Sequence, residues 1–135
     1  MKKIFLLLLL VGFVLYFQVL SFSYSYYDDN FLIVDNKEFI ADWTNLPTVF
    51  GTDVFFGSDL RSVYYRPLLV VSMMLNTFNV DQSPAVYFFG NIVIHVVACF
   101  VLFLVLDSFF ERRLSVLGSF LFLSHPVLVS SVAWI

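Results

Sequence analysis

The segment from Val86 to Leu106 constrains the fold more than any other part of the chain. Its 21 residues contain no Asp, Glu, Lys or Arg, and Tyr87 stands near its start. An α-helix needs about 20 apolar residues to cross the hydrocarbon core of a bilayer, and aromatic side chains are favoured where such a helix enters the interface. The segment therefore predicts a transmembrane helix, which we place over residues 85–106.

A second apolar run extends from Ile4 to Leu20 and is interrupted only by Gln18. At about 1.5 Å per residue, a helix of this length almost spans a bilayer core. We therefore predict a first transmembrane helix over residues 1–21 that is retained as a signal anchor. The alternative is a cleaved secretory signal peptide, because a basic start, an apolar core and small residues such as Ser21 also describe one.

A third apolar segment covers residues 114–135 and contains His125-Pro126. The stretch before this dipeptide covers only about 16 Å as a helix, roughly half the hydrocarbon thickness. The segment therefore either kinks at Pro126 and continues to Ile135, or forms a half-helix that ends in a protein cavity. Because the sequence stops at Trp134-Ile135 without a polar cap, we expect this third span to be incomplete and the chain to be the N-terminal piece of a larger multi-pass protein.

Composition supports a membrane protein and excludes several other classes. Hydrophobic residues make up 61% of the chain and charged residues 13%, whereas soluble domains carry about 25% charged residues. The basic residues form no cluster longer than a pair, so nothing indicates nucleic-acid binding. Cys99 is the single cysteine and can form no internal disulfide. There is no HxxxH, CxxC or glycine-rich phosphate motif, so we expect no metal and no cofactor.

The long segment of residues 22–84, between the first two predicted helices, is acidic. Asn45-Leu46-Pro47 and Gly57-Ser58 read as turns between short elements. Leu68 to Val80 is apolar but too short to span lipid, so we expect an interfacial helix whose first turn holds Pro67. The acidic residues of the segment are Asp28, Asp29, Asp35, Glu38, Asp42, Asp53, Asp59 and Asp81.

The basic residues outside this segment predict its orientation. Lys2-Lys3 precede the first predicted helix, and Arg112-Arg113 lie in the predicted turn of residues 107–113 between the second and third. By the positive-inside rule, both pairs are expected to be cytoplasmic. The N-terminus is then cytoplasmic, and the acidic loop and His125 share the opposite, non-cytoplasmic face.

Two sites in the acidic loop could carry chemistry. A carboxylate of Asp28-Asp29 at the membrane surface can accept a proton from a hydroxyl group, although acidic residues after a transmembrane helix are often merely solvated. The guanidinium of Arg66, beside Tyr65, can bind a lipid phosphate or simply anchor the interface. Asn91 and His95 share one face of the second helix, where we expect hydrogen bonds to neighbouring helices.

Taken in order, these features form a recognisable series. An aromatic residue and an Asp-Asp pair follow the first helix, with Ile and Asn downstream, and then come a Tyr-Arg-Pro-Leu stretch, an Asn-x-x-x-His helix and a His-Pro motif leading to Val-Ala-Trp-Ile. In this chain they are Tyr27-Asp28-Asp29, Ile33, Asn36, Tyr65-Arg66-Pro67-Leu68, Asn91, His95, His125-Pro126 and Val132-Ala133-Trp134-Ile135. The series resembles the start of a GT-C fold membrane glycosyltransferase, specifically the protein O-mannosyltransferase-like family with transmembrane and tetratricopeptide repeats. Leu128 and Ser130 stand where that family often has His and Glu.

The resemblance implies the N-terminal part of an all-α, GT-C-type helical bundle with short amphipathic helices in its first external loop. It implies transfer of a mannose-like sugar from a polyprenyl- or dolichyl-phosphate donor that lies among the membrane lipids. The acceptor would be a hydroxyl group of a protein or glycan on the non-cytoplasmic face. Asp28 or Asp29 would be the catalytic base, with Asp28 favoured because it is the first charged residue after the helix. Arg66, Tyr65 and His125 would bind the lipid phosphate or substrate, and Asn91 and His95 would be structural.

The same resemblance places the protein in a bacterial inner membrane or in the endoplasmic reticulum membrane, and the fragment alone is expected to be inactive. Two rival functions remain. One is a non-enzymatic, multi-pass subunit of a polysaccharide or protein export or assembly system. The other is a secreted or lipid-surface protein whose first segment is a cleaved signal.

Overall fold

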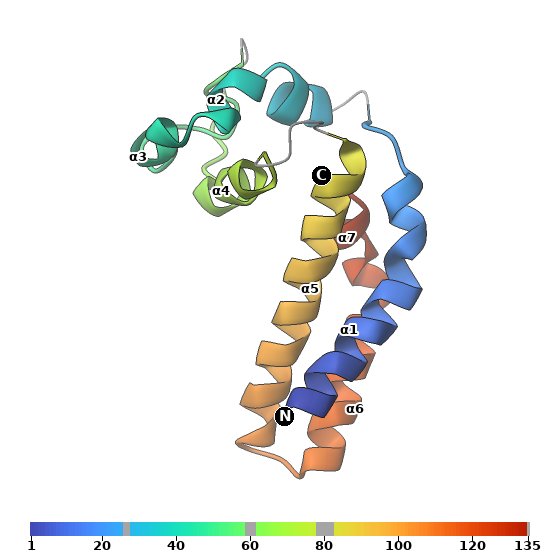
Figure 1. Cartoon of the computed structure of the whole chain (residues 1–135). Coiled ribbons are helices and arrows are strands. Elements are labelled where there is room, and N and C mark those ends of the chain that lie inside the picture. The colour runs from blue at the N-terminus through green and yellow to red at the C-terminus, as the bar shows by residue number, and fades with distance from the viewer. Residues whose placement is uncertain (26–27, 59–61, 78–82, 135) are drawn as a thin grey trace. The chain divides into compact units, whose positions relative to one another are not determined.

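The computed structural model describes residues 1–25, 28–58, 62–77 and 83–134, and in these ranges helices are the only regular secondary structure. The chain divides into two compact units (Figure 1). Unit 1 comprises Met1–Phe22 and Phe88–Ile135, and unit 2 comprises Ser23–Tyr87. The expected all-α membrane architecture is confirmed in these described parts of the chain.

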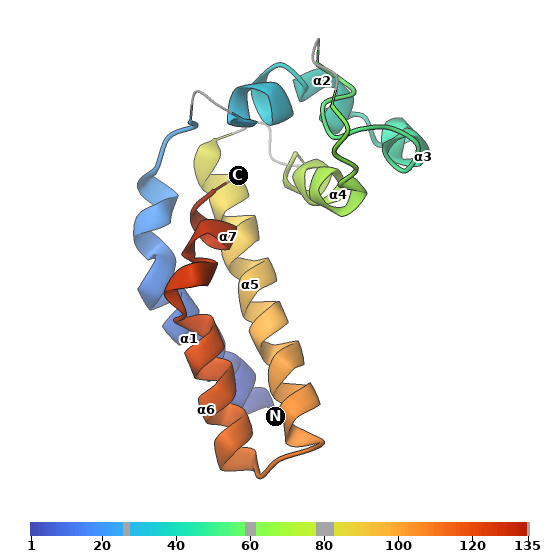
Figure 2. The ribbon, with the colours of Figure 1, turned by 180° about the vertical axis from the view of Figure 1, so that it is seen from behind.

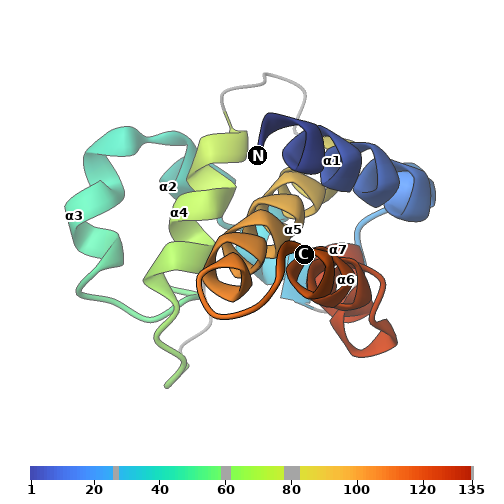
Figure 3. The same ribbon diagram turned by 90° about the horizontal axis from the view of Figure 1, so that it is seen from below.

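Three long helices lie side by side in unit 1 (Figures 1 and 2). They are α1 (Lys2–Tyr16), which a 3-10 turn extends through Phe17–Ser21, α5 (Pro84–Asp107) and α6 (Arg112–Leu123). Seen from below, α1, α5 and α6 occupy separate corners of this unit (Figure 3). Lys2–Ser21 and Pro84–Asp107 are each long and apolar enough to cross a membrane. Both spans follow from the uncharged apolar runs in the sequence.

Close packing of α1 in unit 1 depends on a small residue. A Cβ atom on Gly12 would lie 2.6 Å from Val96 Cγ2 of α5 and 3.5 Å from Leu123 Cδ1 of α6. Small residues let helix backbones approach closely in membranes, where dispersion contacts replace the hydrophobic driving force. The side chains that these helices bury are mostly apolar and include Leu8, Tyr16, Ile92, Val96, Cys99, Phe103 and Leu123.

The third apolar segment is bent by 50° between α6 and the helical stretch Pro126–Ala133. This stretch begins as a 3-10 turn at Pro126–Leu128 and continues as α7 (Val129–Ala133). Proline causes the break because it lacks an N–H group and its ring clashes with the preceding helical turn. The chain bends at Pro126 and further helix follows the bend, and this geometry fits either a broken span or a re-entrant segment. Ile135 lies outside the described residues.

Unit 2 consists of short helical elements. They are a π-helical turn (Asn30–Val34), α2 (Lys37–Ala41), a 3-10 turn (Trp43–Asn45), α3 (Leu46–Val49) and α4 (Pro67–Asn76). The α4 helix contacts both α2 and α3. It begins at Pro67. The Thr77 hydroxyl that follows it donates to the Met74 carbonyl at 2.7 Å and lies 3.2 Å from the Ile40 carbonyl oxygen. Val80, where the sequence pattern placed the end of this helix, lies outside the described residues.

Gly57 is expected to be essential for packing in unit 2. A Cβ atom at this position would overlap Asn36 Oδ1 and lie 2.6 Å from Phe39 Cβ, and Asn36 is only 2% exposed. Overpacking of this kind typically costs about 1–3 kcal/mol. We therefore expect Gly57→Ala to lower the thermal unfolding midpoint measured in detergent micelles. Gly51→Ala is the matched control, because its Cβ would meet only the Thr48 carbonyl at 3.7 Å. Equal midpoints for the two variants would contradict the prediction.

Candidate active site

A pocket of about 330 Å³ in unit 2 contains one carboxylate and one guanidinium group. Its volume is in the range of small-molecule sites, about 300–1,000 Å³. The two charged groups belong to Asp28 and Arg66, which are far apart in the sequence. The remaining lining is apolar or aromatic and comes from Leu32, Val54, Phe55, Tyr64 and Leu69.

Asp28 lies in the same helical stretch as Leu32, which also lines the pocket. Asp28 is exposed, whereas Leu32, one helical turn later, is 5% exposed and forms part of the pocket wall. Residues four apart lie on the same face of a helix, so the carboxylate and this apolar side chain line the same side of the pocket. The resulting carboxylate is open to a ligand and has an apolar neighbour.

The adjacent carboxylate of Asp29 faces the interior of unit 2. It is 3% exposed, and its Oδ2 accepts a hydrogen bond from the Ser25 backbone N–H at 2.6 Å. Its Oδ1 is buried and has no hydrogen-bond partner among the described residues. Burial, together with the nearby Tyr87 and Asp29, raises the pKa of Tyr24, so that phenol stays neutral. The paired acids therefore differ in exposure, and only Asp29 is held by a hydrogen bond from the Ser25 N–H.

Arg66 lies at the N-terminal end of α4, where the helix dipole adds partial positive charge. Its Cζ atom is 5.3 Å from the centroid of the Tyr64 ring, a cation–π distance. Within the described ranges, no carboxylate oxygen lies within 4.0 Å of this guanidinium. The charge of Arg66 is thus supported by an aromatic ring and remains available to an anionic ligand.

Two hydrogen bonds, one between backbone groups and one from a side chain, hold the segment of Tyr64, Tyr65 and Arg66 against the chain before it. The Val54 N–H donates to the Tyr64 carbonyl at 3.0 Å, and the Tyr65 hydroxyl donates to the Phe50 carbonyl at 3.0 Å. Tyr65, the tyrosine named in the sequence pattern, does not line the pocket, whereas Tyr64 does. No sequence signal distinguishes these adjacent tyrosines, because the local backbone direction decides which one faces the pocket.

The other predicted site residues belong to unit 1 and contact its third segment. His95 Nε2 lies 3.2 Å from the Leu123 carbonyl oxygen, and the Asn91 side-chain amide donates to the Trp134 carbonyl at 3.0 Å. His125 is exposed, and its Nδ1 accepts a hydrogen bond from the Val127 N–H at 3.3 Å. Tyr27 lies outside the described residues, and in the described ranges no three His, Cys, Asp or Glu side chains are placed to hold a metal ion.

The arrangement in unit 2 suits a particular chemistry. An exposed carboxylate can take a proton from a hydroxyl group, and a guanidinium can bind a phosphate and offset the negative charge that develops on it. The apolar lining of the same pocket favours a ligand with a hydrocarbon portion beside its polar group.

The chain is similar over most of its length to proteins named as protein O-mannosyl-transferases. It is 32% identical to protein O-mannosyl-transferase TMTC3 from Homo sapiens over 110 residues. These aligned residues cover 78% of this chain and 12% of that protein. It is 31% identical over 115 residues to protein O-mannosyl-transferase TMTC1 from Mus musculus, 81% of this chain and 12% of the relative. It is also 31% identical over 128 residues to protein O-mannosyl-transferase Tmtc1 from Drosophila melanogaster, 91% of this chain and 15% of the relative.

The chain therefore spans only 12–15% of the length of these relatives. No family model and no solved structure matches it. The resemblance that the ordered motifs indicated is confirmed by these relatives, as a partial match at modest identity.

Proposed function

Because the chain is homologous over most of its length to protein O-mannosyl-transferases, we propose that the full-length protein is a GT-C-type membrane glycosyltransferase. It transfers a mannose-like sugar from a polyprenyl- or dolichyl-phosphate donor to a hydroxyl group of a protein or glycan acceptor. The similarity of the relatives supports the reaction class, and the composition of the unit 2 pocket supports the kind of donor.

The single observation that carries this proposal is that Asp28 and Arg66 line one pocket. Asp28 accepts the proton of the acceptor hydroxyl as its oxygen bonds to the anomeric carbon of the sugar. The bond from that carbon to the phosphate oxygen breaks, and its electron pair leaves with the lipid phosphate, whose charge Arg66 stabilises. One displacement of this kind inverts the anomeric configuration.

We further propose that this reaction takes place on the non-cytoplasmic face, with the N-terminus of the chain in the cytoplasm. The positive-inside rule supports this orientation, because Lys2 and Lys3 are the first residues of one candidate span and Arg112 and Arg113 follow the end of the other. The α4 helix rests in the interface beside the lipid chain of the donor, consistent with the exposed apolar residues Leu68 and Leu75. The multi-pass protein resides in a bacterial inner membrane or in the endoplasmic reticulum membrane.

Arg66→Gln tests this function directly. In the full-length protein, assayed with a lipid-phosphate mannose donor, we expect kcat/KM to fall about 10²–10³-fold, because the charge that stabilises the leaving phosphate is lost. Arg66→Lys should retain an intermediate activity, since lysine keeps the charge but not the planar, bidentate donor geometry.

Lys37→Gln is the matched control, because Lys37 is an exposed cation of unit 2 outside the pocket. It should retain the parent kcat/KM. Parent-level kcat/KM in Arg66→Gln would refute the role of Arg66. The parent protein could also transfer no sugar from either a polyprenyl- or a dolichyl-phosphate donor. That result would favour the alternative function, a non-enzymatic subunit of an export or assembly system.

A further inference from the structure

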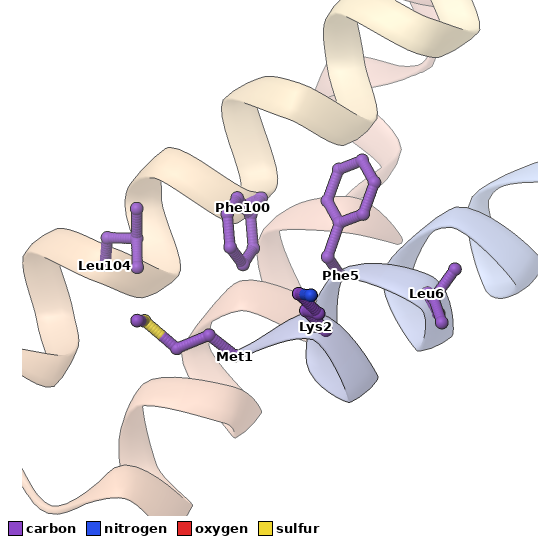
Figure 4. Close-up of a pocket in the computed structure, with 6 residues that line it drawn as sticks. All are labelled: Met1, Lys2, Phe5, Leu6, Phe100 and Leu104. Carbon is purple, nitrogen blue, oxygen red and sulfur yellow. The ribbon is translucent and has the colours of Figure 1, made fainter.

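A second cavity, of about 440 Å³, lies in unit 1 between the start of α1 and the last turns of α5 (Figure 4). It belongs to the candidate membrane spans rather than to the acidic loop. Its lining residues are Met1, Lys2, Phe5, Leu6, Phe100 and Leu104.

The walls of this cavity offer almost only apolar contacts. The rings of Phe5 and Phe100 meet edge to face with centroids 5.1 Å apart, and the side chain of Met1 extends toward Leu104 (Figure 4). Lys2 is the one lining residue with a charged side chain. A ligand that matches this lining has a flexible hydrocarbon chain with a negative group at one end.

The charges at this end of unit 1 also favour an anionic ligand. The N-terminus lies near the turn between α5 and α6 (Figure 1). This end holds Lys2, Lys3, Arg112 and Arg113 against Asp107 and Glu111, so four positive and two negative side chains leave a net charge of +2. Asp107 is already engaged, because Arg112 donates to it at 3.2 Å. Basic residues beside a membrane span attract anionic lipids of the adjacent leaflet.

We propose that this cavity binds one acyl chain of an anionic glycerophospholipid, with the lipid phosphate on the Lys2 ammonium group. The site is distinct from the donor pocket. All of its lining residues belong to unit 1, whereas the donor pocket is lined by residues of unit 2. The inference does not depend on the proposed transferase activity.

Native mass spectrometry of the full-length protein tests this site. Protein is released from nanodiscs that contain phosphatidylglycerol and phosphatidylcholine with identical acyl chains in equal amounts. We expect one phosphatidylglycerol molecule to be retained per chain in preference to phosphatidylcholine. Lys2→Gln should lower this preference about fivefold, the effect of one cation at the membrane surface. Lys3→Gln is the matched control for charge, because Lys3 does not line the cavity and should have a smaller effect.

Leu104→Trp should fill the cavity and abolish retention of the lipid. Val101→Trp controls for the added bulk, because Val101 is 51% exposed on the same helix but does not line the cavity. Equal effects of Lys2→Gln and Lys3→Gln, or retained lipid in Leu104→Trp, would overturn the proposal. The absence of any retained phospholipid would also overturn it, because the cavity would then bind no lipid. Displacement of phosphatidylglycerol by polyprenyl phosphate at an equal concentration would overturn it as well, because that result assigns the cavity to another lipid.

Discussion

Asp28→Asn is expected to lower the rate of sugar transfer by the full-length protein about 10²–10⁴-fold, the usual contribution of a general base. The substitution preserves the shape of the side chain but removes its ability to take a proton. Asp28 is exposed at the pocket that also contains Arg66, so the fold of unit 2 should tolerate the change. The measurement is kcat under saturating lipid-linked donor, with far-ultraviolet circular dichroism to show that the variant remains folded.

Asp29→Asn separates the roles of the two adjacent acids. Asp29 is buried and accepts a hydrogen bond from the Ser25 N–H, so its replacement should destabilise unit 2 rather than remove the base. We expect a lower unfolding temperature and a smaller loss of kcat than in Asp28→Asn. Asp35→Asn, at an exposed acid outside the pocket, should leave both quantities unchanged. Asp28→Asn could instead keep full turnover while a folded Asp29→Asn loses it. That pair of results would assign the general base to Asp29 rather than to Asp28.

The spans of unit 1 could be predicted from the sequence because a single property determines them. An uncharged apolar run long enough to cross lipid has few alternatives to a helix, since every backbone polar group must be satisfied internally. The runs ending at Leu20 and Leu106 accordingly became the candidate spans Lys2–Ser21 and Pro84–Asp107. The start of α4 at Pro67 follows from a similarly local rule, because proline suits the first helical turn.

The pocket of unit 2 could be predicted only in part. The ordered motifs drew attention to Asp28 and Arg66, but no sequence rule states that residues so far apart line the same cavity. The neighbours of these residues were harder still to assign. Asp29 is buried beside an exposed Asp28, and Tyr64 lines the pocket in place of Tyr65. In both pairs the residues are chemically alike, and tertiary packing alone decides which one lines the pocket.

The carbonyl group of Leu123 illustrates a second limit of sequence reasoning. Its regular helical partner is the Val127 N–H, which donates instead to His125 Nδ1, and Pro126 has no N–H to offer. Pro126 predicts the break in the helix from the sequence. The groups that replace the lost N–H donor to the Leu123 carbonyl lie on other helices. The Tyr16 hydroxyl of α1 donates to the Leu123 carbonyl at 2.8 Å, and His95 Nε2 of α5 lies 3.2 Å from the same oxygen. A hydrogen bond from His95 to this carbonyl requires the tautomer with the proton on Nε2, the atom that also lies 3.9 Å from Cys99 Sγ.

Removing both donors should therefore destabilise unit 1 strongly. Tyr16 and His95 are 5% and 7% exposed, so water has little access to replace either group. Tyr16→Phe or His95→Leu alone should cost about 0.6–2 kcal/mol, because the other donor still satisfies the carbonyl. The double variant leaves a carbonyl unsatisfied within a predicted membrane span and should cost about 3–5 kcal/mol. The loss in the double variant thus exceeds the sum of the single losses, the mark of two groups that share one acceptor.

Reversible unfolding of the full-length protein in mixed detergent and SDS micelles, followed by circular dichroism, measures these costs. Tyr16→Phe combined with His95→Gln is the matched control, because the glutamine amide restores a donor near the Leu123 carbonyl without restoring the ring. This control should recover much of the stability that Tyr16→Phe with His95→Leu loses. Strictly additive losses, or equal stability of the Leu and Gln variants at position 95, would mean that packing of the His95 ring against Tyr16 and Phe122 holds the bend instead. A non-additive loss of stability together with rescue by glutamine would show that the Leu123 carbonyl, shared by two donors, holds the bend. Packing of the His95 ring would produce neither result.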